Sequence, residues 1–331
     1  MKKPAISVIA PAYNIASFIG DCIKSILKQS FKDFELIIVD DGSTDDTLKI
    51  CHEYEKEDSR IKILESNHQG VGAARNLGLA NSLGKYIAFI DGDDMVHQRY
   101  LEILYHTLLN FNADIVNVGF ERKTTVSKDW TESNLGSYKP VVFTADDIYN
   151  YMFAGLKCTT VWAMLYKKSL LENHKFDKFS VSEDVEYNSR VYQAVKRYIY
   201  IPLPLYFYRD RINSAVTSRF NLTKLDGMRA IEKTYYNILQ TNPGYEHYAL
   251  IRLYKSIISL YYNAPNEYKN DVVRLNEDLK QKTIKKFIHH KKIKPGLKFI
   301  FICFLKFPRL YKIFRQFMEW KAKHALSKTK N

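Results

Sequence analysis

The first 120 residues alternate short apolar runs with amphipathic stretches, and no other feature constrains the fold as strongly. Short apolar runs between turn-forming residues are typical of buried strands, and the longer stretches have the spacing of helices. Five runs are predicted as strands: Ile6–Ala10, Glu35–Val39, Ile61–Leu64, Tyr86–Ile90 and Asp114–Val118. Because strands that alternate with helices form a parallel sheet covered on both faces, we predict a doubly wound α/β half-domain.

Helices are predicted between these strands. The first presents one apolar face, made of Phe18, Ile19, Cys22, Ile23, Ile26 and Leu27. A second begins after the capping residues Ser43, Thr44, Asp45 and Asp46 and is expected to bury Leu48, Cys51 and Tyr54.

Further along the chain, residues 121–140 are expected to form a polar connection. Met164–Leu171 and Asp184–Val195 are expected to be helices, and the apolar run before Arg209 is expected to be a strand.

The length of 331 residues exceeds that of one ordinary compact domain, so two unequal units are expected. Strand alternation stops before about residue 220, and the rest is helix-patterned or basic. We therefore predict an α/β domain over 1–218, with halves at 1–120 and 121–218, and a helical region over 219–331. Four scattered cysteines without ligand spacing predict reduced thiols and no structural zinc.

The net charge of +14 is confined to the C-terminal end. Residues 281–331 carry 15 of the 50 Lys and Arg residues and only one of the 36 acidic residues, which leaves 35 of each sign in the rest of the chain. A basic segment of this kind binds nucleic acid, coats an anionic membrane or is simply solvated. Its interleaved aromatic residues, between about 282 and 326, favour an amphipathic segment at an anionic membrane surface over a nucleic-acid arm.

No segment is predicted to cross a membrane or to direct export. The longest uninterrupted apolar stretch, Phe299–Leu305, has 7 residues, whereas a spanning helix requires about 20. The N-terminus runs directly into a predicted strand without a signal-peptide pattern. We therefore expect a cytoplasmic protein attached peripherally to the inner face of the cell membrane, with no nucleic-acid partner.

Two acidic clusters follow predicted strands, at Asp40-Asp41 and at Asp91-Gly92-Asp93-Asp94. In an open α/β sheet, ligands bind beyond the carboxyl ends of the strands, so both clusters are expected at one crevice. Three carboxylates within four residues repel one another unless a cation joins them. Hard oxygen ligands of this kind suit Mg²⁺ or Mn²⁺ bound together with substrate phosphates.

Several motifs together resemble family 2 glycosyltransferases with the GT-A fold, over roughly residues 5–215. They are Pro11-Ala12-Tyr13-Asn14, Val39-Asp40-Asp41-Gly42-Ser43-Thr44-Asp45, Gly70-Val71-Gly72-Ala73-Ala74-Arg75-Asn76, Asp91-Gly92-Asp93-Asp94, Trp162-Ala163-Met164-Leu165-Tyr166 and Glu183-Asp184. The resemblance implies a GT-A catalytic domain with a doubly wound mixed sheet over 1–218, followed by a helical C-terminal region. The domain's nucleotide-sugar half would be 1–120 and its acceptor half 121–218.

The resemblance also implies site roles. A UDP-sugar donor would be bound by Pro11, Tyr13, Asn14, Asp40, Asp41, Arg75, Asp91, Arg209, Arg211 and Ser214. Asp91 and Asp93 would hold Mn²⁺ or Mg²⁺, with Asp94 as a further ligand. Asp184 would be the general base, and Trp162 and Glu183 would bind a glycan or lipid-linked acceptor. The implied role is bacterial cell-surface polysaccharide assembly, as in capsule, teichoic acid or lipooligosaccharide synthesis.

Elementary chemistry agrees with this assignment. A divalent metal and arginines stabilise the charge that builds on a diphosphate leaving group, and a carboxylate on the opposite side can take the acceptor's proton. One metal site and one base suffice for direct displacement with inversion.

The same residues allow alternative interpretations. The broken glycine pattern at Gly70-Val71-Gly72 disfavours a dehydrogenase, and the second acidic cluster disfavours a receiver domain. Trp162 could be a core residue, and Asp184 could be a helix N-cap. A nucleotide-sugar-binding pseudoenzyme and a membrane-attached interaction module also remain as alternative functions.

Overall fold

The computed structural model describes residues 3–125, 130–155, 159–211, 220, 223–269 and 283–306. The chain divides into two compact units, Met1–Asn237 and Ile238–Asn331. This division falls inside helix α7 (Thr223–Thr241), later in the chain than the boundary expected at 218/219. The extent of the functional α/β domain stays a prediction.

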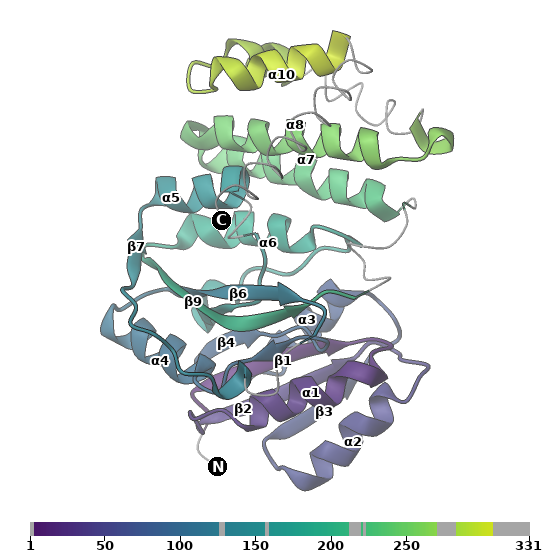
Figure 1. The fold of residues 1–331 in the computed structure, drawn as a ribbon, viewed down its shortest axis with the longest axis vertical. Coiled ribbons are helices and arrows are strands. Elements are labelled where there is room, and N and C mark those ends of the chain that lie inside the picture. Colours follow the sequence, from purple (N-terminus) through teal and green to yellow (C-terminus); the bar gives the residue numbers. More distant parts are fainter. Residues whose placement is uncertain are drawn as a thin grey trace, which may run out of the picture. The chain divides into compact units, whose positions relative to one another are not determined.

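A mixed sheet forms the core of the first unit (Figure 1). Within the described residues its strands are β1 (Ile6–Ala12), β2 (Phe34–Asp40), β3 (Ile61–Glu65), β4 (Tyr86–Phe89), β5 (Met95–Val96), β6 (Ile115–Lys123), β7 (Val141–Phe143), β8 (Met164–Lys167) and β9 (Tyr198–Arg209). The order is β3-β2-β1-β4-β8-β6-β9-β5, and β7 pairs with β9. The first four strands are parallel, β8 is antiparallel to both of its neighbours, and β6 is parallel to β9. The predicted α/β class with a mixed sheet is confirmed.

Helices cover both faces of this sheet. In the first unit they are α1 (Ala16–Leu27), α2 (Thr47–Glu57), α3 (Val71–Ala80), α4 (Tyr100–Asn110), α5 (Ala145–Asn150), α6 (Glu183–Val191) and most of α7. On one face, α1, α2 and α4 pack against Val8, Ala10 and Ile38. On the opposite face, Ala74 of α3 packs against Ile37 and Val39. All seven residues of β1 are buried because this central strand is covered on both sides.

The predicted helix over Met164–Leu171 is wrong, because this segment forms strand β8 followed by a short 3₁₀ turn, Lys168–Leu170. Met164, Leu165 and Tyr166 are all fully buried between β4 and β6. A strand covered on both faces has no polar alternation, so its short apolar run resembles a segment of buried helix.

Two smaller details also differ from the expectation. β6 continues to Lys123, into the segment expected to be a connection. In α2 the buried positions are Thr47 and Cys51, while Leu48 and Tyr54 are half-buried. The reason is that α2 turns the hydroxyl of Thr47 inward, where it accepts a hydrogen bond from the backbone N–H of Ile15 at 2.8 Å.

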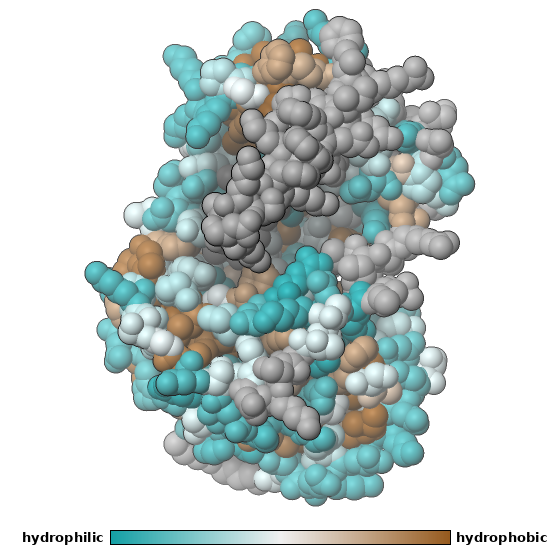
Figure 2. All heavy atoms as spheres, viewed as in Figure 1, coloured by the Kyte–Doolittle hydropathy of each residue, from teal (hydrophilic) through white to brown (hydrophobic). Residues whose placement is uncertain are grey.

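The second unit contains α8 (Glu246–Asn263), a helical stretch over 283–289 and α10 (Pro295–Lys306). Tyr254, Phe287 and Phe301 pack together, with ring centroids 4.0 to 5.1 Å apart. Phe299 is 67% exposed on α10, where Figure 2 shows hydrophobic residues at the surface. Within the ranges that the structure describes, no helix has the length and apolar character needed to span a membrane.

Candidate active site

The carboxyl ends of β1, β2 and β4 meet at one edge of the sheet. The register pairs Ala12 with Asp40, and β4 runs parallel to β1 on its other side. Gly92 follows β4 and donates a backbone hydrogen bond to the carbonyl of Pro11 at 3.2 Å. A side chain at Gly92 would come within 2.8 Å of that carbonyl oxygen, so this close approach requires glycine. Both predicted acidic clusters therefore lie at the same edge.

The carboxylate of Asp41 is buried and holds the turn that leads into α3. Its Oδ1 accepts hydrogen bonds from the Ser66 hydroxyl and from the backbone N–H of Gln69 at 2.9 Å. Its Oδ2 accepts from the backbone N–H of Gly70 at 2.7 Å. The residue expected to contact the donor thus also shapes the 66–70 loop, a role that sequence reasoning missed.

Asp40 points to the other face of β2 and is also buried. Its Oδ2 accepts a hydrogen bond from the backbone N–H of Ser43 at 2.9 Å. Its Oδ1 is buried and has no hydrogen-bond partner in the described part of the chain. An unpaired buried acceptor costs about 1–3 kcal/mol, so a ligand hydroxyl, an N–H group or water at this atom would be stabilising.

Tyr13 and His68 form an exposed aromatic pair beside Asp41. Their rings stack with centroids 4.1 Å apart, and Tyr13 is 41% exposed. The Nδ1 atom of His68 lies 3.6 Å from Oδ2 of Asp41. Asn14 fixes the neighbouring loop, because its side-chain oxygen accepts from the backbone N–H of Thr44 at 2.8 Å. The sequence gives no signal for His68 at this site, and only the fold brings its ring to Tyr13.

Arg75 lies between two acidic groups that come from distant parts of the chain. Its Nη2 donates to Oδ1 of Asp91 at 2.8 Å, and its Nη1 donates to Oε1 of Glu183 at 2.7 Å. The side chain is only 4% exposed. Burial alone lowers the pKa of Arg75, but the charges of Asp91 and Glu183 outweigh it and raise the pKa above its usual value. The expected donor ligand Arg75 and acceptor ligand Glu183 are therefore joined to each other and to Asp91 of the D-x-D motif, Asp91-Gly92-Asp93.

The segment Asp91-Gly92-Asp93-Asp94 forms an acidic loop. Tyr206, which sequence reasoning did not identify, holds this loop in place. The Tyr206 hydroxyl donates to Oδ2 of Asp94 at 2.7 Å and accepts from the backbone N–H of Asp91 at 3.1 Å. Oδ1 of Asp94 accepts from the backbone N–H of Arg209 at 2.8 Å. Burial, followed by the charges of Asp93 and Asp91, raises the pKa of Asp94 well above its usual value.

The arrangement fits a divalent cation at two of the three predicted carboxylates. Within the described residues, no group of three or more acidic, histidine or cysteine side chains could hold a metal. Asp94 is 1% exposed and turned into the protein, so the predicted set of three ligands is not assembled. Asp91 and Asp93 remain partly exposed. The pKa of Asp93 is raised, first by burial and second by the negative charge of Asp91. Two carboxylates supplemented by phosphate and water oxygens match the usual coordination of Mg²⁺.

Two arginines lie against the same loop. Nε of Arg211 is 2.5 Å from Oδ2 of Asp93, and Nε of Arg209 donates to the carbonyl of Asp93 at 3.0 Å. Both guanidinium groups lie over the ring of Phe18, at 5.4 and 5.2 Å. The loop thus carries two cations beside its carboxylates. Ser214, the remaining predicted donor ligand, lies outside the described residues.

Asp184 is the second residue of α6, one position after Glu183. The helix begins at Glu183 and its N-cap is Ser182, so Asp184 does not occupy the cap position. Asp184 is half-buried, and its Oδ1 accepts from the backbone N–H of Val185 at 2.7 Å. Because Glu183 is bonded to Arg75, the first turn of α6 is anchored to the acidic loop.

Trp162 is 7% exposed and lies just before β8 rather than on a helix. Its ring stacks on Tyr206 at 4.7 Å and on Tyr208 at 5.4 Å, with Phe120 edge-on at 5.0 Å. This burial matches the core alternative, and the contact with Tyr206 connects Trp162 to the acidic loop. Its predicted role in acceptor binding stays a prediction.

Several known proteins resemble this chain in sequence. The family model described as glycosyl transferase family 2 matches residues 7–174. Glycosyltransferase GlyA of Streptococcus pneumoniae is 34% identical over 215 residues, which is 63% of this chain and 31% of that protein. The chain thus spans less than a third of that relative. The Bacillus subtilis glycosyltransferase TuaG, whose name assigns it to teichuronic acid biosynthesis, is 37% identical over 161 residues, or 48% of this chain and 62% of that protein.

A similar fold is found among solved structures. The crystal structure of Staphylococcus aureus TarS 1-349 in complex with UDP-GlcNAc aligns with a TM-score of 0.68 and 20% identity. The alignment covers 87% of this chain and 83% of that one. At this level of identity the likeness establishes the GT-A fold.

Proposed function

This chain belongs to glycosyltransferase family 2, and we propose that it transfers a sugar from a UDP-sugar to a hydroxyl of a glycan or lipid-linked acceptor. The observation that carries the proposal is the Arg75 bridge, which joins the D-x-D residue Asp91 to the Glu183-Asp184 pair. A displacement reaction needs a charge-stabilising site and a base on opposite sides of one sugar carbon. A rigid connection between the two sites supports that geometry.

The donor's nucleoside is proposed to bind beside Tyr13 and the two buried aspartates. The exposed Tyr13–His68 pair offers an aromatic surface for a base. The unpaired Oδ1 of Asp40 offers an acceptor for a ribose hydroxyl or a base N–H. We take the base to be uracil because the structurally similar TarS was solved with UDP-GlcNAc.

The diphosphate is proposed to lie at the acidic loop. Asp91 and Asp93 would hold Mn²⁺ or Mg²⁺, which, when bound, offsets negative charge on the leaving diphosphate. Arg209 and Arg211 already lie against this loop and would orient the phosphate oxygens. Asp94 would position the loop rather than bind the ion, since both of its oxygens accept hydrogen bonds from the protein.

Asp184 is proposed as the base that takes the proton of the acceptor hydroxyl. One base and one leaving-group site support a single displacement with inversion at the sugar carbon. Glu183 would then position Arg75 and the first turn of α6, in place of the acceptor contact that the motif implies. The assignment to cell-surface polysaccharide synthesis is supported by the name of the relative TuaG.

The basic C-terminal segment is proposed to attach the enzyme to an anionic membrane surface. In its described part, Lys291, Lys292 and Lys294 are exposed just before α10, and Phe299 is exposed on it. Cationic and aromatic side chains together bind the headgroup region of anionic bilayers. The residues after 306 lie outside the described ranges.

The test is a panel of UDP-sugars assayed for metal-dependent hydrolysis, transfer and thermal stabilisation. Binding stabilises the folded state by mass action, so a bound donor raises Tm even without an acceptor. Metal-dependent turnover of at least one UDP-sugar supports the proposal. Stabilisation by UDP without any turnover would instead favour the pseudoenzyme, and absence of both would leave an interaction module.

A further inference from the structure

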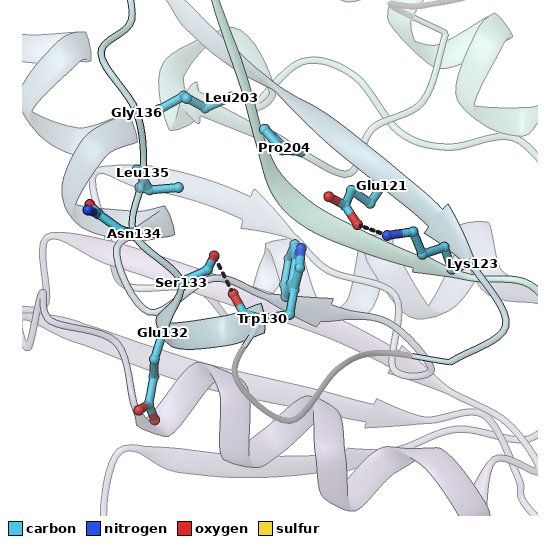
Figure 3. Close-up of a pocket in the computed structure, with 10 residues that line it drawn as sticks. All are labelled: Glu121, Lys123, Trp130, Glu132, Ser133, Asn134, Leu135, Gly136, Leu203 and Pro204. Carbon is cyan, nitrogen blue, oxygen red and sulfur yellow. Dashed lines mark hydrogen bonds and ion pairs between the residues drawn. The ribbon is translucent and has the colours of Figure 1, made fainter. Parts of the chain in front are cut away.

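A hollow of about 560 Å³ opens beside strands β6 and β9 (Figure 3). Its lining includes Glu121, Lys123, Trp130, Asn134, Leu203 and Pro204. Successive residues of a strand point to opposite faces. In β9, Tyr206 and Tyr208 stack on Trp162, whereas Phe207 between them packs on Trp130, with centroids 5.5 Å apart. The hollow therefore lies on the other face of these strands from Trp162.

The wall that carries Trp130 is fixed by bonds to the segment after the acidic loop. The backbone N–H of Gln98 donates to the carbonyl of Thr131 at 2.8 Å, and Nε2 of His97 lies 3.0 Å from the carbonyl oxygen of Ser133. The Trp130 ring packs edge-on against His97 at 6.2 Å. A hollow held in this way exists before any ligand arrives, as is usual for binding sites of this volume.

Each charged side chain of the lining has an ionic partner. Nζ of Lys123 lies 2.8 Å from a carboxylate oxygen of Glu121, and Glu132 pairs with Lys28 at 3.2 Å. Two acids and two lysines make up these exposed pairs, so they carry no net charge that would attract an ion. The lining therefore favours an uncharged ligand.

The remaining groups suit a sugar. Trp130 is only 8% exposed, but it lines the hollow, and its ring stands between Ser133 and Lys123 in Figure 3. The Asn134 amide is exposed and adds both a donor and an acceptor. Leu203 and Pro204 supply apolar surface for the C–H face of a sugar ring. An aromatic ring, an amide and apolar surface together recognise a ring that bears hydroxyl groups.

We propose that this hollow binds a neutral sugar unit of the acceptor glycan, away from the hydroxyl that reacts. The inference rests on the proposed function, because a transferase that acts on a chain of sugars benefits from a second hold on it. Two linked contacts raise the effective concentration of the reacting end without any new contact at the catalytic residues. Glycans that reach both sites would therefore be preferred over single sugars.

The test uses fluorine NMR of the full chain labelled with fluorotryptophan. The sequence has three tryptophans, and Trp130→Phe assigns one resonance to Trp130. Cellotetraose, maltotetraose and chitotetraose are the probes. At least one is expected to shift the Trp130 resonance saturably in the absence of UDP-sugar and metal, so the readout does not depend on catalysis.

Gly136 offers a matched set of variants, since a Cβ atom at this lining position would meet nothing within 4 Å. Gly136→Phe should fill the hollow and weaken sugar binding at least about tenfold, which is 1.4 kcal/mol. Gly136→Ala should bind like wild type. Gly244→Phe should also bind sugar like wild type, because Gly244 is equally open but belongs to the second unit.

The outcomes separate the two proposals. If no tetrasaccharide shifts the Trp130 resonance, if only the Trp162 resonance moves, or if Gly136→Phe binds as well as wild type, the hollow is not a sugar site. If sugars shift Trp130 as expected but no UDP-sugar is ever turned over, the proposed transfer fails while sugar binding in the hollow stands.

Discussion

Arg75 and Glu183 are 108 positions apart in sequence, yet their side chains meet in a buried ion pair at 2.7 Å. The same guanidinium also donates a hydrogen bond to the carboxylate of Asp91. Because Arg75 lies on α3, this helix connects the acidic loop to the start of α6. Breaking a buried pair leaves an uncompensated charge in a low-dielectric site. The connection is therefore important for stability as well as for positioning.

Replacing Arg75 should show both effects. Arg75→Ala should reduce the free energy of unfolding by about 3–5 kcal/mol, measured by denaturant titration. Arg75→Lys keeps the charge but offers no planar fork for two carboxylates, so turnover should fall more than stability does. Arg190→Lys is the control, because Arg190 pairs with buried Glu186 on the same helix α6. If both lysine variants lose turnover equally, the Arg75 bridge has no special role.

Tyr206→Phe should loosen the acidic loop while keeping the ring stack on Trp162. The lost hydroxyl leaves the Asp91 N–H and one Asp94 oxygen unpaired, which costs about 1–3 kcal/mol. We expect a higher metal concentration for half-maximal activity, measured by Mn²⁺ titration. Tyr100→Phe is the control, since its buried hydroxyl makes only a 3.4 Å contact with the Met164 carbonyl. An unchanged Mn²⁺ requirement in Tyr206→Phe would contradict the positioning role.

UDP binding should require a divalent cation, and Asp93→Ala should abolish the metal-dependent part. The reason is that Asp91 and Asp93 are the partly exposed carboxylates of the loop. UDP affinity measured by calorimetry with Mn²⁺ and with EDTA decides this. Equal affinities in wild type would rule out metal-assisted donor binding.

The sequence predicted the parallel strands and the acidic clusters because both are local signals. Short apolar runs set the strands, and carboxylates crowded after Phe89 indicate a cation. Tyr206 could not be found in this way, since it lies within an apolar run and meets Asp91 from 115 positions away. The Arg75 bridge and the strand β8 likewise depend on long-range pairing, which leaves no periodic mark on the sequence.

Deleting the residues after about 290 removes Phe301 from the core of the second unit but leaves the first unit, which holds the proposed site, intact. The shortened chain should therefore turn over a soluble acceptor but no longer sediment with anionic vesicles. Each Lys or Arg near an anionic surface contributes roughly 1 kcal/mol of attraction, and the deletion removes 12 of the 15 that lie in 281–331. Sedimentation with phosphatidylserine vesicles at rising salt measures this. Vesicle binding that survives the deletion, or that ignores salt, would contradict attachment through this segment.

The most direct measurement of the central claim compares transfer rate and UDP-sugar affinity on one preparation of Asp184→Asn. The amide has nearly the same shape, so affinity and Tm should change little. It cannot accept the acceptor's proton, so turnover should fall on the order of 10²–10⁴-fold, and NMR of the wild-type product should show an inverted anomeric configuration. Near-normal turnover in Asp184→Asn, or a product with retained configuration, would contradict a single displacement with Asp184 as its base.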